Sequence, residues 1–80
     1  MIEYKDNNVM VDAHNYGWDV IDCVDLLEEY YVSEIGYYER TVVTKATKDK
    51  FYLTVYNREW VTTLSCDEQG NVTVEAHDNN

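Results

Sequence analysis

Basic residues are missing from most of this 80-residue chain. Residues 6–39 contain nine acidic side chains and no Lys or Arg, and residues 59–80 contain five acidic side chains and again no base. Only residues 40–58 are locally basic, with five Lys or Arg and one Asp. The net charge of −10 opposes contact with phosphate groups, which depends on summed positive charge. Direct binding to nucleic acid is therefore not expected.

Cysteine, glycine, histidine and apolar runs are also scarce, and proline is absent. Cys23 and Cys66 match no zinc motif, so two reduced thiols are the preferred interpretation and a Cys23–Cys66 bridge is the alternative. Two histidines offer too few ligands for a metal site. Three glycines can hardly build a phosphate-binding loop, and no nucleophile lies in a catalytic motif, so we expect neither enzymatic activity nor a cofactor.

The length and the start of the chain indicate a small cytoplasmic protein. Residues 1–80 are enough for a single small acidic domain with one core. The first residues lack the basic and apolar regions of a secretory signal. No stretch approaches the ~18 apolar residues of a membrane span, so no membrane contact is expected.

Residues 16–33 have the apolar period of an amphipathic helix. Apolar side chains recur at i, i+3, i+4, i+7, i+10 and i+11, which places them in one stripe along a helix. The stripe consists of Val20, Cys23, Val24, Leu27, Tyr30 and Tyr31. Asn15 or Gly17 is a candidate N-cap, and Gly36 is expected to follow the last turn.

The remaining apolar patterns have the period of strands. Residues 40–77 alternate apolar and polar side chains between turn sequences, which is typical of an antiparallel meander. Residues 8–13 alternate in the same way and suggest a short additional strand. The sequence predicts an α+β fold in which one helix packs on a four- to five-stranded antiparallel sheet, covering the face that carries Phe51, Leu53 and Val55.

The polar side of the predicted helix carries only negative charge. Four carboxylates fall within about 120° opposite the apolar stripe, and a fifth lies at the margin. They are Asp19, Asp22, Asp25 and Glu29, with Glu28 at the margin. Most helices mix both signs because Glu–Lys pairs at i,i+4 stabilise them, whereas like charges cost a few tenths of a kcal/mol per pair. We interpret the row as a surface for a cationic protein, and an ordinary solvated face is the alternative.

Aromatic and apolar side chains near this row are predicted to take part in binding. The chain contains eight tyrosines, which supply contact area at little cost in rotamer entropy, although tyrosine also fills the cores of small sheet proteins. The candidate partner-binding residues are Trp18, Asp19, Asp22, Asp25, Leu26, Glu28, Glu29, Glu34, Tyr37 and Tyr38.

In charge, size and tyrosine content the chain resembles small phage-encoded inhibitors that mimic DNA, such as anti-CRISPR proteins and inhibitors of uracil-DNA glycosylase or restriction enzymes. This resemblance of composition implies an inhibitor in the host cytoplasm that occupies the basic nucleic-acid-binding cleft of a nuclease, defence protein or DNA-processing protein. An immunity protein or antitoxin that neutralises a basic toxin would use the same charges. A housekeeping interaction module is a third interpretation. An exposed strand edge also allows two copies to pair as a homodimer.

Overall fold

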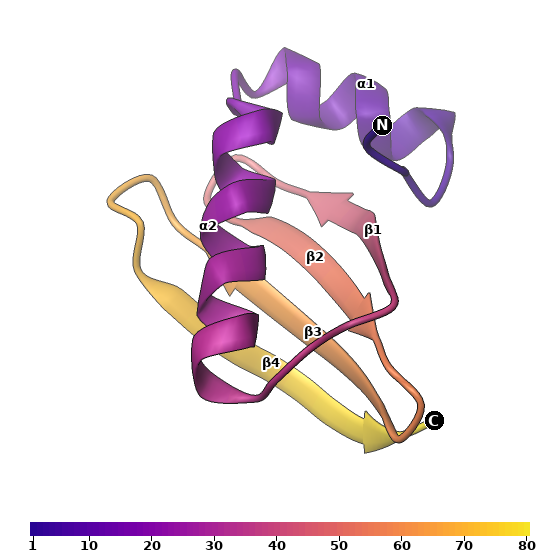
Figure 1. Cartoon of the computed structure of the whole chain (residues 1–80). Helices are drawn as coiled ribbons and strands as arrows, with labels where there is room; N and C mark the ends of the chain where they lie inside the picture. Colours follow the sequence, from indigo (N-terminus) through magenta and orange to yellow (C-terminus); the bar gives the residue numbers. More distant parts are fainter.

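Two helices and a four-stranded antiparallel sheet make up the computed structural model, which describes all residues 1–80. Helix α2 runs across one face of the sheet, and α1 lies at one end beside β1 (Figure 1). The elements are α1 (Asn7–Asn15), α2 (Val20–Glu34), β1 (Arg40–Ala46), β2 (Phe51–Tyr56), β3 (Trp60–Cys66) and β4 (Val72–Asn79). The α+β fold predicted from the sequence is confirmed.

The sheet is the predicted meander, with strand order β1-β2-β3-β4. Leu53 in β2 pairs with Val43 in β1 and with Leu64 in β3, so three apolar side chains share one row. Phe51, Leu53 and Val55 are buried, as expected for the face that α2 covers. Alternation along the strands therefore determines which face of the sheet receives the helix.

Helix α2 begins at Val20, later than predicted, and its apolar stripe faces the sheet. Val24, Leu27 and Tyr31 from this stripe are buried. The hydroxyl oxygen of Tyr31 accepts a hydrogen bond from Nδ2 of Asn57 at 2.8 Å, which satisfies the polar tip of this buried ring. The predicted helical period is confirmed, and it leaves the carboxylates on the opposite side.

The strand predicted for residues 8–13 is wrong, because this segment is helix α1. Asp6 caps the helix, since its Oδ1 accepts a hydrogen bond from the N–H of Val9 at 3.0 Å. Val9 and Ala13, four residues apart, are both buried. An alternation this short contains an i,i+4 pair, so it fits one face of a helix as well as one face of a strand.

Gly17 ends α1 and does not cap α2. Its φ of 79° lies in the left-handed region that favours glycine. The Gly17 N–H donates to the carbonyl of His14 at 3.1 Å, and the Trp18 N–H donates to the carbonyl of Ala13 at 3.0 Å. This pair of bonds is the Schellman motif of a helix C-terminus. The N-cap of α2 is Asp19, so the predicted caps at Asn15 and Gly17 are wrong.

The segment before α1 runs along the outer edge of β1. Tyr4 forms a parallel bridge with Val43. The N–H of Lys5 donates to the Val43 carbonyl at 2.8 Å, and the Val43 N–H donates to the Glu3 carbonyl at 2.9 Å. Arg40 forms an ion pair with Glu3 beside this bridge. The N-terminal segment therefore covers the β1 edge, while β4 lies at the other edge of the sheet.

Candidate functional site

The first turn of α2 holds two of the predicted carboxylates. Oδ1 of Asp19 accepts a hydrogen bond from the N–H of Asp22 at 3.2 Å. This cap satisfies one of the free N–H groups at the start of the helix, and both carboxylates lie near the positive end of the helix dipole. The dipole offsets part of their mutual repulsion, which allows the row of negative charge to begin at the helix terminus.

Four exposed carboxylates follow one another along α2. They are Asp19, Asp22, Asp25 and Glu29, which we call the acidic ridge. Neither of the two ion pairs in the structure, Arg40–Glu3 and Lys50–Glu75, involves α2. The acidic ridge is therefore exposed, helical and without a neutralising cation of its own.

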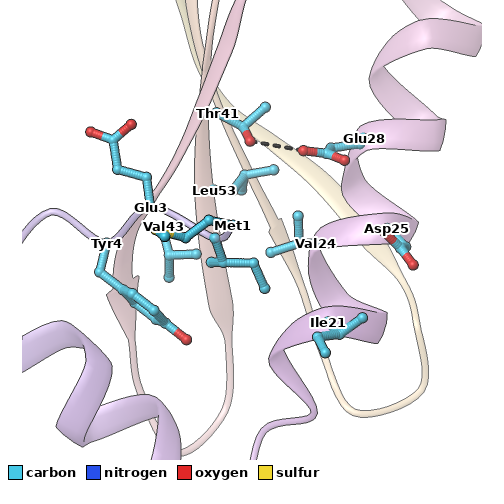
Figure 2. Close-up of a pocket in the computed structure, with 11 residues that line it drawn as sticks. Met1, Glu3, Tyr4, Ile21, Val24, Asp25, Glu28, Thr41, Val43 and Leu53 are labelled. Atoms are coloured by element: carbon cyan, nitrogen blue, oxygen red, sulfur yellow. Dashed lines mark hydrogen bonds between the residues drawn. The ribbon is translucent and has the colours of Figure 1, made fainter.

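Glu28 lies on the side of α2 that faces β1. It is half-buried, and its Oε2 accepts a hydrogen bond from Oγ1 of Thr41 at 2.8 Å (Figure 2). Tyr38 lies nearby and packs edge-on against Tyr31, with ring centroids 6.2 Å apart. Burial, and then the negative charges of Glu28 and Asp25, raise the pKa of the Tyr38 hydroxyl. Glu28 and Tyr38 thus flank the acidic ridge on its β1 side.

Glu34 and Tyr37 extend the exposed surface past the end of α2. Gly36, with a φ of 145°, follows the helix as predicted, and its N–H donates to the Tyr31 carbonyl at 3.1 Å. Tyr37 is 63% exposed and makes no aromatic contact in the structure. Both predicted residues are accessible, although they lie at the opposite end of α2 from Asp19.

Trp18 and Leu26, two of the predicted apolar anchors, pack on the core. The indole Nε1–H of Trp18 donates to the carbonyl of Thr47 at 2.7 Å, and its ring lies 6.0 Å from that of Phe51. Leu26 is half-buried and packs on the core near Gly70 in the loop between β3 and β4. Both side chains therefore have structural contacts, and neither stands free among the carboxylates.

Ile21 and Val32 are exposed aliphatic residues that were not among the predicted site residues. They are 64% and 54% exposed, respectively. At 100° per residue, Ile21, Asp25 and Val32 point within about 40° of one another. The outward side of α2 therefore combines carboxylates with aliphatic side chains. The helical period of the sequence contains this signal, because both positions fall between Glu28 and Asp25 around the helix and outside the apolar stripe.

A cleft of about 590 Å³ separates α2 from the N-terminal segment, and we call it the α2–β1 cleft. Figure 2 shows Ile21, Asp25 and Glu28 on α2 at one side, Glu3 and Tyr4 at the other, and Met1 between the two sides. Its apolar lining includes Val24, Val43 and Leu53. The cleft adjoins the acidic ridge, because Asp25 belongs to both.

The crowding of carboxylates on α2 predicts an unusual response to acid. The negative charge of Asp19, and then its hydrogen bond to Asp22, raise the pKa of the Asp22 carboxyl. A carboxyl whose folded-state pKa is raised binds more protons in the folded protein than in the unfolded chain, so stability increases as the pH falls through that pKa toward the unfolded-state value. We expect the Tm, followed by circular dichroism, to rise as the pH is lowered from 7 through the raised pKa of Asp22 toward the ordinary Asp value of about 4.

Other carboxylates have lowered pKa values, and they should make the protein less stable again at lower pH. Hydrogen bonds from Asn71 lower the pKa of Asp67, and those from Ser65 and Lys50 lower the pKa of Glu75. Their stabilising effect is lost as the pH falls through these lowered values, so the Tm should decrease again below about pH 4. An Asp22→Asn variant should show a smaller rise between pH 7 and about 4, and a wild-type Tm that only decreases from pH 7 downward would contradict the prediction.

The two cysteines are free thiols that line a groove at the N-terminal end of α2. The structure contains no Cys23–Cys66 disulfide. The hydrogen bond with Cys66, burial and the nearby carboxylates raise the pKa of the Cys23 thiol, which keeps it protonated and weakly nucleophilic. No three His, Cys, Asp or Glu side chains converge in a group that could hold a metal ion. Neither helix has the length and apolar character needed to cross a membrane.

Comparisons of the chain with models of protein families, with curated proteins and with solved structures give no match. The acidic ridge and the α2–β1 cleft lie side by side on the molecule, and their position and chemistry point to a function.

Proposed function

We propose that the protein is a phage-encoded, protein-binding inhibitor that acts in the host cytoplasm. Its acidic ridge occupies the Lys- and Arg-lined nucleic-acid-binding cleft of a defence or DNA-processing protein and competes with the natural ligand. Catalysis plays no part in this role. Specific protein complexes of this kind form by long-range electrostatic attraction, with association that is fast and sensitive to salt.

The observation that carries this proposal is the exposed row of carboxylates without an intramolecular cation on α2. From Asp19 to Glu29 the row spans about 15 Å of helix axis at 1.5 Å per residue. Its charge density is lower than that of duplex DNA, which carries one charge per ~1.7 Å of axis, but the row is held on a rigid helix. A basic groove shaped for a phosphate backbone is complementary to such a row.

Capture from a host lysate on the immobilised protein tests the proposal, provided that elution is done in two ways. We expect a basic nucleic-acid-binding protein to be retained at low salt and to be released both by high salt and by short duplex DNA, since the DNA competes for the same groove. An uncharged polymer at the same concentration serves as the control. A partner that high salt releases but duplex DNA does not would contradict competition with nucleic acid.

The same experiment separates the proposed inhibitor from an immunity protein or antitoxin. Capture of a small basic toxin, with recovery of the toxin's activity after elution, would assign the acidic ridge to the second role. A housekeeping module with an ordinary acidic surface would retain no partner whose binding depends on salt. All three functions would use the same carboxylates of this chain. The identity of the captured protein therefore distinguishes them.

A further inference from the structure

The α2–β1 cleft has an apolar interior and an exposed apolar edge. Val24, Val43 and Leu53 are buried beneath it, and Ile21 stands at the edge with 64% of its surface exposed. The volume of about 590 Å³ is within the roughly 300–1,000 Å³ of pockets that bind ligands. The apolar surface that is left open beside this hollow belongs to Ile21 and Met1, which both line it and are both exposed.

Charge at the edge of the cleft favours one class of occupant. Asp25 and Glu28 line the α2 side, and the amino-terminal group of Met1 is the one basic group among the lining residues. Glu3 lines the opposite side, where it pairs with Arg40. A second copy of this chain, with a net charge of −10, is repelled at this edge, whereas a basic segment is attracted. The occupant that fits both the interior and the edge is a basic protein segment with an apolar side chain.

We infer that the cleft receives one large aliphatic or aromatic side chain of the partner, flanked by Lys or Arg residues that contact the acidic ridge. This inference rests on the proposed function, because it assigns the cleft to the same basic partner. Charge attraction accelerates association, and a buried apolar anchor slows dissociation. The cleft then distinguishes its partner from other basic proteins, which match the charge but lack the anchor.

Two synthetic peptides of equal charge, KKKKLKKKK and KKKKSKKKK, test the inference. Both should bind at low salt through the acidic ridge. The peptide with leucine should bind about tenfold more tightly, as expected from burying one leucine side chain. In methyl NMR spectra, it should also shift the signals of Val24, Val43 and Leu53, whereas the peptide with serine should leave them unchanged.

Substitutions on the two helices provide matched controls. Ile21→Ser removes the apolar edge of the cleft and should bring the affinity ratio of the two peptides close to one, without weakening the serine peptide. Val11→Ser replaces an aliphatic residue of α1 that is 42% exposed and lies outside the cleft, so it should leave the ratio unchanged. Circular dichroism confirms that both variants remain folded.

The outcomes separate the cleft from the proposed function. Equal affinity of the two peptides for the wild-type protein, with the methyl signals unmoved, would overturn the inference and leave the role of the acidic ridge intact. Failure of both peptides to bind at low salt would overturn the proposed function and the inference with it. A tenfold ratio that Ile21→Ser abolishes and Val11→Ser preserves supports the cleft as the site of the anchor.

Discussion

Reversal of Asp22, Asp25 and Glu29 to lysine is expected to weaken binding of the basic partner about a hundredfold at low salt. Each exposed ion pair that is lost costs about 0.5 kcal/mol, and the new lysine adds repulsion of similar size. Three reversals together amount to roughly 3 kcal/mol, a factor of about 100 in Kd. The effect should shrink as salt is added, because screening weakens both attraction and repulsion.

The folded state should tolerate these reversals. All three side chains are exposed, and none of them forms an ion pair. Because crowding with Asp19 and Asp25 raises the pKa of Asp22, replacing these carboxylates relieves repulsion within α2. We therefore expect an unchanged or slightly higher Tm, which separates a loss of binding from a loss of structure.

A second triple variant controls for net charge. Asp49, Glu59 and Asp78 are exposed residues in the two hairpin turns of β1–β3 and in β4, outside the acidic ridge and the α2–β1 cleft. Reversing them to lysine changes the net charge from −10 to −4, as in the α2 variant, since each reversal adds two positive charges. We expect this control to retain most of the affinity. Equal losses in both variants would show that total charge, and not the acidic ridge, determines binding.

Replacement of Leu27 by alanine is expected to lower the Tm by on the order of 15 °C. Leu27 is 0% exposed and lies at the centre of the α2 stripe. Truncating a buried leucine costs about 2–5 kcal/mol, whereas a domain of 80 residues is stable by only roughly 4–12 kcal/mol. Since α2 carries the acidic ridge, the variant should lose partner binding in parallel with its helical signal on heating.

Leu26→Ala is the matched control for this core substitution. Leu26 is the preceding residue on the same helix, and it is only half-buried. Its truncation removes less buried surface, so we expect a cost of about 1 kcal/mol and a Tm decrease of a few degrees. Thermal unfolding followed by circular dichroism compares the two variants directly. A similar Tm for both would mean that α2 does not pack on the sheet through Leu27.

Patterns within single elements explain how much of this site could be predicted. Side chains three or four residues apart lie on the same face of a helix, so a period of 3.6 residues divides its side chains into two faces. Val24 and Leu27 therefore point inward, whereas Asp25 and Glu29 point outward. In the same way, a period of two assigned Phe51 to the covered face of the sheet. Such patterns require no knowledge of distant contacts.

Contacts between distant segments account for the features that were not predicted. The hydrogen bond from Trp18 to the Thr47 carbonyl joins residues 29 positions apart and turns a predicted partner anchor into a core residue. Thr41 likewise binds Glu28 across the β1 side of α2. Residues 8–13 became a helix because Val9 and Ala13 could both join the core beside β1, a choice that five alternating residues leave open.

The sequence by itself determined the fold class, the inward stripe of α2 and the row of carboxylates on its outer side, because each depends on spacing within one element. Only the tertiary structure decided that α1 is a helix, that Trp18 and Leu26 pack inward, and that a cleft with apolar walls opens beside Asp25. A cleft forms where α2, β1 and the N-terminal segment meet, and the separation between elements is set by the packing of side chains from all of them.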